Sequence, residues 1–154
     1  MSRRLAMLAV IAGALAFAVR ARSDAPFDQY GVYTPSNPTV RDQFTHLEWW
    51  RETESGNVVS AVSTCGAHGQ GYRLPTLREL LTLVDEEPHK IYVGGQELPR
   101  FIDRNAFPNT SITTDYLTST PKPGGRYWTV SFATGEVSSL PSGQDTSIRC
   151  VRVY

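Results

Sequence analysis

The chain has 154 residues, of which 40% are hydrophobic, with 15 basic side chains, 15 acidic side chains and two cysteines. This length is sufficient for one globular domain once a targeting segment is removed. The balanced charge argues against a protein that binds polyanions such as nucleic acid, because neutralising phosphates or sulfates requires a basic excess, although it leaves room for a local basic patch.

Residues 1–21 have the pattern of a secretory signal peptide. Two arginines precede an apolar run, Leu5–Val19, and small residues allow cleavage after Ala21 or as late as Ala25. An uncleaved membrane anchor is the alternative, but the apolar run is shorter than the ~20 residues that span a bilayer. Cleavage after Ala21 leaves 12 basic and 15 acidic residues, a net charge of −3. We therefore expect a periplasmic or secreted protein without a stable membrane span.

Residues 22–38 are mostly polar and contain prolines, so they are predicted to form an extended N-terminal segment. Two strands are predicted next, Val40–Asp42 and Leu47–Trp50, with a short turn between them. Alternation along the second strand places Trp49 in the core and Trp50 on the opposite, more exposed face.

Two helices are predicted in the middle of the chain. The first spans Val58–Cys65, and one of its sides carries three apolar residues, Val58, Val62 and Cys65. The second runs from Thr76 to about Glu86, with leucines recurring on one face. Pro75 fixes its start, and Thr76 with Glu79 has the spacing of a capping box.

The polar residues of this second helix are interpreted as structural rather than as an active site. Arg73, Glu79 and Asp85 are predicted to form a polar set, with Glu79 serving the cap. The acidic run Asp85–Glu87 is expected to be solvated at the helix end and to contact one of three arginines, Arg73, Arg149 or Arg152. A small cation site or polar-ligand site is the alternative.

The stretch 89–123 is predicted to be the least regular part of the chain, because glycines and prolines interrupt it. Ile91–Val93 reads as a short strand or loop edge. Four apolar residues are expected to anchor the stretch to the core, namely Phe101, Ile102, Phe107 and Ile112. Long irregular stretches in compact domains usually carry function or contain small elements, so a binding site is expected among these loops.

Four strands are predicted toward the C-terminus, Tyr116–Thr120, Arg126–Phe132, Glu136–Leu140 and Ile148–Tyr154. The second and third form a hairpin. The order of strands, two helices, a loop region and further strands indicates an α+β fold. Cys65 and Cys150 are expected to pair in an exported protein; the alternative is two buried free thiols.

Six short motifs, in order, resemble the bacterial Lcl C-terminal-type domain, over 39–154. They are V-x-D-x-x-T-x-L-x-W from Val40, R-L-P-T-x-x-E-L-x-x-L-V-D from Arg73, I-D-x-x-x-F-P-N-T from Ile102, the S-T of Ser119–Thr120, W-x-V-x-F-x-x-G from Trp128 and R-C-V-R from Arg149. The chain departs from the family at Leu117, where an aromatic residue is usual, and around 89–98, which is longer than usual.

The resemblance implies a compact C-type-lectin-like fold, related to that of the formylglycine-generating enzyme, with two helices on short antiparallel sheets and long irregular loops. It also implies a disulfide from the first helix to the last strand. The family is a domain of unknown function, so the ligand remains open between a glycan and an envelope protein. Candidate ligand contacts are Trp50, Asp115, Tyr116, Thr118, Ser119 and Asp145.

A non-catalytic binding or adhesion module is the expected function, without a cofactor or metal. An enzyme on the related oxidase fold is one alternative, but its chemistry needs two reactive cysteines, and the three histidines lack a metal-ligand spacing. A structural component of the cell envelope is the other alternative.

Overall fold

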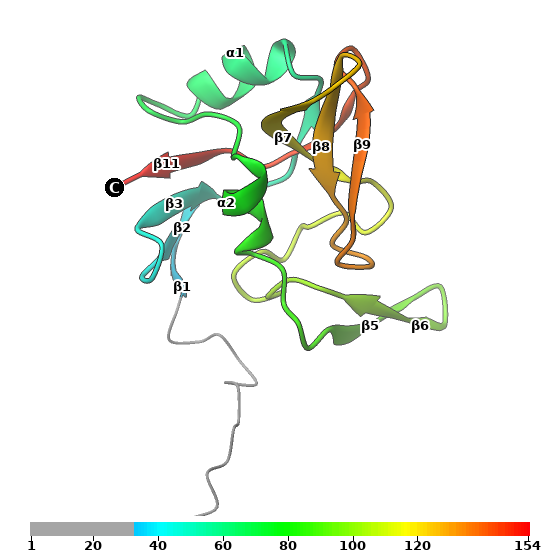
Figure 1. Cartoon of the computed structure of the whole chain (residues 1–154). Helices are drawn as coiled ribbons and strands as arrows, with labels where there is room; N and C mark the ends of the chain where they lie inside the picture. Colours follow the sequence, from blue (N-terminus) through cyan, green and yellow to red (C-terminus); the bar gives the residue numbers. More distant parts are fainter. Residues whose placement is uncertain (1–32) are drawn as a thin grey trace, which may run out of the picture.

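The computed structural model describes residues 33–154. The predicted signal peptide, and the extended segment up to residue 32, lie outside the described residues. These residues form three sheets and two short helices. Figure 1 shows helix α1 (Ser60–Gly66) at one end of this part of the chain and the hairpin of β5 (His89–Val93) and β6 (Gln96–Arg100) at the other. The predicted α+β fold, with helices on short and mainly antiparallel sheets, is confirmed.

The first sheet has the order β1-β2-β3-β11, with bounds Tyr33–Ser36, Thr39–Asp42, Leu47–Trp50 and Val151–Val153. The predicted β2–β3 hairpin is confirmed, with Val40 opposite Trp49. β1 belongs to the segment that was predicted to be extended, and in it Tyr33 pairs with Asp42 and is buried.

The second sheet has the order β4-β10-β7-β8-β9, with bounds Glu54–Gly56, Thr146–Ile148, Tyr116–Lys122, Arg126–Val130 and Val137–Pro141. The predicted β8–β9 hairpin is confirmed. The strand predicted over 148–154 is two strands in different sheets. Ile148 ends β10, Arg149 and Cys150 cross between the sheets, and Val151 begins β11 beside β3.

The helix α1 spans Ser60–Gly66 and differs from the prediction in its buried side. Ala61 and Cys65 are fully buried, whereas Val62 is 76% exposed. Cys65 and Cys150 form a disulfide with their Cα atoms 5.4 Å apart, within a buried cluster that includes Leu117. The predicted pairing is confirmed, and it ties α1 to the crossing between the two sheets.

The helix α2 spans Leu77–Leu81 and is shorter than predicted. After Leu81 the backbone tightens, because Thr82 and Leu83 donate to carbonyls three residues earlier. Asp85 then donates its backbone N–H to Phe101, at 3.1 Å, which ends the helical path. Leu80 and Leu83 are still buried in the larger core with Trp49. The short helix therefore still packs on the core through these two leucines.

The capping box at Thr76 is confirmed. The Glu79 backbone N–H donates to the Thr76 hydroxyl at 3.2 Å, and the Thr76 N–H donates to the Glu79 carboxylate at 2.7 Å. Arg73 holds the same carboxylate with two donors, at 2.7 and 2.8 Å. Asp85 does not belong to this polar set.

The acidic run after α2 also differs from the prediction. Asp85 lies 3.3 Å from His89, four residues on. The three arginines that were expected nearby have other partners: Arg73 contacts Glu79, Arg152 contacts Glu48, and Arg149 is buried elsewhere.

We expect Thr76→Ala to lower the free energy of unfolding by about 1 kcal/mol, because the Glu79 N–H loses its acceptor at the helix start. Urea unfolding measures the change. Thr76→Ser keeps the oxygen and should stay within about 0.5 kcal/mol of the unmodified protein. Equal stability of Thr76→Ala and Thr76→Ser would contradict the capping role.

The third sheet is a hairpin of β5 (His89–Val93) and β6 (Gln96–Arg100). It lies where an irregular stretch with a short strand over 91–93 was predicted. Gly94 and Gly95 have φ of 59° and 82°, the conformation that a two-residue hairpin turn requires and that glycine adopts without strain. The glycines therefore join two strands here instead of ending regular structure. Within residues 33–154, no helix has the length and apolar character to cross a membrane.

Candidate functional site

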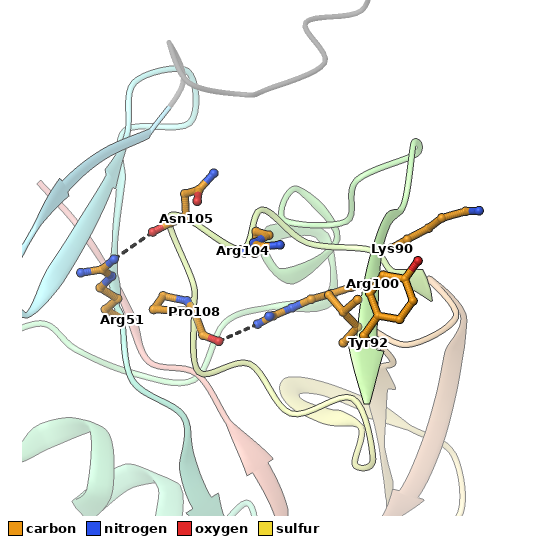
Figure 2. Close-up of a pocket in the computed structure, with 8 residues that line it drawn as sticks. Arg51, Lys90, Tyr92, Arg100, Arg104, Asn105 and Pro108 are labelled. Atoms are coloured by element: carbon orange, nitrogen blue, oxygen red, sulfur yellow. Dashed lines mark hydrogen bonds between the residues drawn. The ribbon is translucent and has the colours of Figure 1, made fainter. Parts of the chain in front are cut away.

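The best candidate for a binding site is a cleft between the β5–β6 hairpin and the loop 104–108. Its volume is about 640 Å³, within the range of small-ligand sites, and it is open to solvent. Figure 2 shows Lys90 and Tyr92 on the hairpin side and Arg104, Asn105 and Pro108 on the loop side. The remaining lining residues are Arg51, Ile91 and Arg100.

Four cationic side chains give this cleft a positive charge. Two of them bind backbone oxygens of the loop: Arg51 donates to Asn105 and Ala106 at 2.8 and 2.9 Å. Arg100 donates to the Phe107 carbonyl at 2.7 Å and to that of Pro108 at 3.2 Å. Carbonyls satisfy donors but do not neutralise charge, so these hydrogen bonds leave both guanidinium groups positively charged, and the nearby charge of Asp103 offsets only part of that of Arg100.

The other two cations are more exposed. Lys90 lies 3.1 Å from Glu97 on the neighbouring strand, with 72% of its side chain exposed, so this pair is weak and easily exchanged. Arg104 is exposed at the rim of the loop. Both side chains are therefore available to a ligand.

Arg100 is the most informative residue of the cleft. It is 7% exposed, and its Nε atom is buried with no hydrogen-bond partner in the described structure. Burial lowers the pKa of the Arg100 guanidinium, and the nearby charge of Arg104 also acts to lower it. A negative group in the cleft would offset both effects. The arrangement therefore favours an anionic ligand.

A second buried cation lies behind the same loop. Arg149 is fully buried and donates to the Arg51 carbonyl at 2.7 Å and to the Thr110 hydroxyl at 2.9 Å. Its guanidinium carbon lies 4.6 Å from the centre of the Phe107 ring. Burial lowers the pKa of Arg149, and Arg100 also acts to lower it. This side chain fixes the loop from inside and adds positive charge beneath the cleft.

The six predicted contact residues lie outside this cleft. Tyr116 and Thr118 are fully buried, so neither side chain is open to a ligand, which corrects that expectation. Asp115 lines a separate hollow of about 660 Å³ with hydroxyl residues and Glu136, and it accepts a hydrogen bond from Thr129 at 3.0 Å. None of the other five candidates lines that hollow.

The three remaining candidates are held by structural contacts. Trp50 is half-buried and stacks on His68 with 3.9 Å between the ring centres. Ser119 donates to the Pro75 carbonyl at 3.1 Å, and Asp145 accepts from Asn57 at 2.8 Å. The structure therefore does not gather the six residues into one site.

The cationic residues of the cleft were not predicted. Lys90, Arg100 and Arg104 do lie in the stretch after Pro88, where a binding site was expected, but Arg51 comes from a distant part of the chain. The signal in the sequence that could have located the hairpin was Gly94–Gly95 directly after Ile91–Val93, a run of β-branched and aromatic residues.

Comparison with known families supports the motif resemblance. Residues 38–152 match the family model described as the Lcl C-terminal domain. The match runs from the β1–β2 turn to β11, so it includes both walls of the cleft and both cysteines. A search of curated proteins found no match to the chain.

Proposed function

The chain belongs to the Lcl C-terminal domain family, and we propose that it is an exported, non-catalytic module that binds negatively charged ligands in the cleft beside β5. One observation carries the proposal. Arg100 is a buried cation on the wall of an open cleft, its described partners are carbonyls, and its Nε atom has none. Buried charges usually have a partner of opposite sign, and a bound anion would supply it.

Export and the lack of catalysis rest on other features. The disulfide is typical of oxidising compartments outside the cytosol, in agreement with the signal pattern of residues 1–21. It also uses both cysteines of the chain, so an oxidase chemistry that needs a pair of free thiols is not favoured. A structural role in the envelope remains compatible, since the anionic ligand could belong to an envelope component.

Removing the two exposed charges of the cleft should weaken binding to a polyanion. We expect Lys90→Gln with Arg104→Gln to reduce affinity for polyacrylate about tenfold, since exposed ionic contacts contribute up to about 1 kcal/mol each. Calorimetric titration measures this, and the affinity of the unmodified domain should fall as salt is raised.

The matched control is Arg78→Gln with Lys122→Gln, which removes the same net charge from residues outside the cleft. It should bind polyacrylate nearly as well as the unmodified protein. Equal losses in both double variants would show that net charge alone acts. The absence of any binding to polyacrylate would contradict the proposal altogether.

A further inference from the structure

The strand β5 has a free edge. β5 and β6 form a two-stranded sheet, and no third strand of the described chain pairs with either of them. Val93 and Gln96 flank the two-residue turn, so they form the closing hydrogen-bonded pair. Hydrogen-bonded pairs alternate along antiparallel strands, which makes Lys90 and Tyr92 the non-hydrogen-bonded positions of β5. Their backbone N–H and C=O groups therefore point away from β6.

These backbone groups are unused. Within residues 33–154, no backbone or side-chain hydrogen bond joins the main chain of Lys90 or Tyr92 to another residue. The opposite edge of the hairpin is different, because Pro99 lies opposite Lys90 and has no N–H to offer. Proline on an edge strand discourages pairing, so the hairpin presents one complete edge, that of β5.

The free edge faces the cationic cleft. Three consecutive residues of β5, Lys90–Tyr92, line the cleft, although successive side chains of a strand point to opposite faces. Consecutive residues of a strand can all line one cleft when the edge of the strand, rather than one of its faces, borders that cleft. Figure 2 shows the loop residues Arg104 and Pro108 across from β5, with the Arg100 side chain between them. The same space thus offers backbone hydrogen bonds and positive charge.

We propose that an extended acidic polypeptide segment binds in this cleft by adding a strand to β5. Its main chain pairs with the outward groups of Lys90 and Tyr92, and its carboxylates lie within the cleft lined by Arg100 and Arg104. The inference rests on the proposed function, since it assigns a ligand class to the same cleft. It commits to a polypeptide because a free strand edge pairs with amide groups, which a polysaccharide chain does not present in this pattern.

The test compares two probes that share carboxylates but differ in backbone: the peptide acetyl-Glu-Val-Glu-Val-Glu-Val-amide and polyacrylate. Tyr92→Pro removes one outward N–H at a position that does not bond β6, and Tyr92→Thr removes the same ring but keeps the N–H. We expect Tyr92→Pro to bind the peptide about tenfold more weakly than Tyr92→Thr does, with equal binding of polyacrylate by the two variants.

Hydrogen exchange on the unmodified protein gives an independent reading, because bound peptide should slow exchange of the Lys90 and Tyr92 amides. Equal peptide binding by Tyr92→Pro and Tyr92→Thr would overturn strand addition, while binding of polyacrylate would still support the anion cleft. If neither probe binds the unmodified protein, the proposed function fails as well. If Tyr92→Pro loses both probes, its hairpin is damaged and the exchange result decides: slowed amides support strand addition, and unchanged amides overturn it.

Discussion

Replacing Cys65 and Cys150 together with alanine should lower the free energy of unfolding by about 4–5 kcal/mol. The two cysteines are 85 positions apart, and a cross-link over a loop of this length restricts the unfolded chain strongly in the chain-entropy model. Both are fully buried, so the substitution also removes two sulfur atoms from a packed cluster. Domains of this size are usually stable by only about 5–15 kcal/mol, so the variant should be close to unfolding at 37 °C.

Urea unfolding under non-reducing conditions measures this effect, and thiol titration of the denatured protein confirms the oxidation state. Val62→Ala is the matched control, because Val62 lies on the exposed side of the same helix and should change stability by less than about 0.5 kcal/mol. A double variant within about 1 kcal/mol of the unmodified protein would show that the bridge contributes little. Two titratable thiols in the unmodified protein would reopen the redox alternative.

The features that were predictable from sequence are those set by neighbouring residues. The β2–β3 and β8–β9 hairpins follow from alternation and turn residues, and the start of α2 follows from Thr76 and Glu79. The prediction of where α2 ends was wrong, because the end depends on a distant residue. The backbone N–H of Asp85 donates to the carbonyl of Phe101 and does not continue the helix. The sequence around the helix contains no information about a hydrogen-bond acceptor that comes from a distant part of the chain.

Glu48 illustrates a further limit of pattern reasoning. Its place in β3, next to Trp49, predicts an exposed side chain, yet it is 2% exposed. Burial alone would raise the pKa of its carboxyl, but hydrogen bonds from Arg41, Tyr72 and Arg152 hold the pKa below its ordinary value. These donors come from three separate parts of the chain, so only the folded structure reveals the compensation.

The candidate site was unpredictable for the same reason. Its walls come from the hairpin β5–β6, from the loop 104–108 and from Arg51, the residue directly after β3. The neutral composition of the whole chain gave no indication of a local positive cleft. Glu97 pairs with Lys90 beside the cleft, and most of the other acidic residues that balance the count do not line it.

Arg149→Met should lower the free energy of unfolding by about 3 kcal/mol, and the sign of this effect is not obvious. A buried charge is costly, and replacing buried ionic groups with apolar residues of similar size can be neutral or stabilising. Here the partners decide the outcome. The Arg149 guanidinium donates to the carbonyls of Trp50 and Arg51 and to the hydroxyls of Thr53 and Thr110.

Methionine supplies no donor to these four oxygens. The carbonyls belong to the backbone at and just after the end of β3 and cannot turn toward solvent without moving the strand, and each buried acceptor without a partner costs about 1–3 kcal/mol. The contact of the guanidinium with the Phe107 ring is also lost. The loss of donors should therefore outweigh the relief of desolvation. Unfolding in urea measures the sum, and unchanged or raised stability would show that desolvation dominates.

Arg104→Met makes the same chemical change at an exposed position and should alter stability by less than about 0.5 kcal/mol. The two variants should separate again in binding. Arg104→Met removes a charge from the cleft rim, so it weakens polyacrylate binding without loosening the fold. Arg149→Met releases Thr110 and Phe107, and because Arg100 binds the carbonyls of the same loop, the cleft wall should lose its fixed position. Affinity should then fall although no residue lining the cleft has been changed.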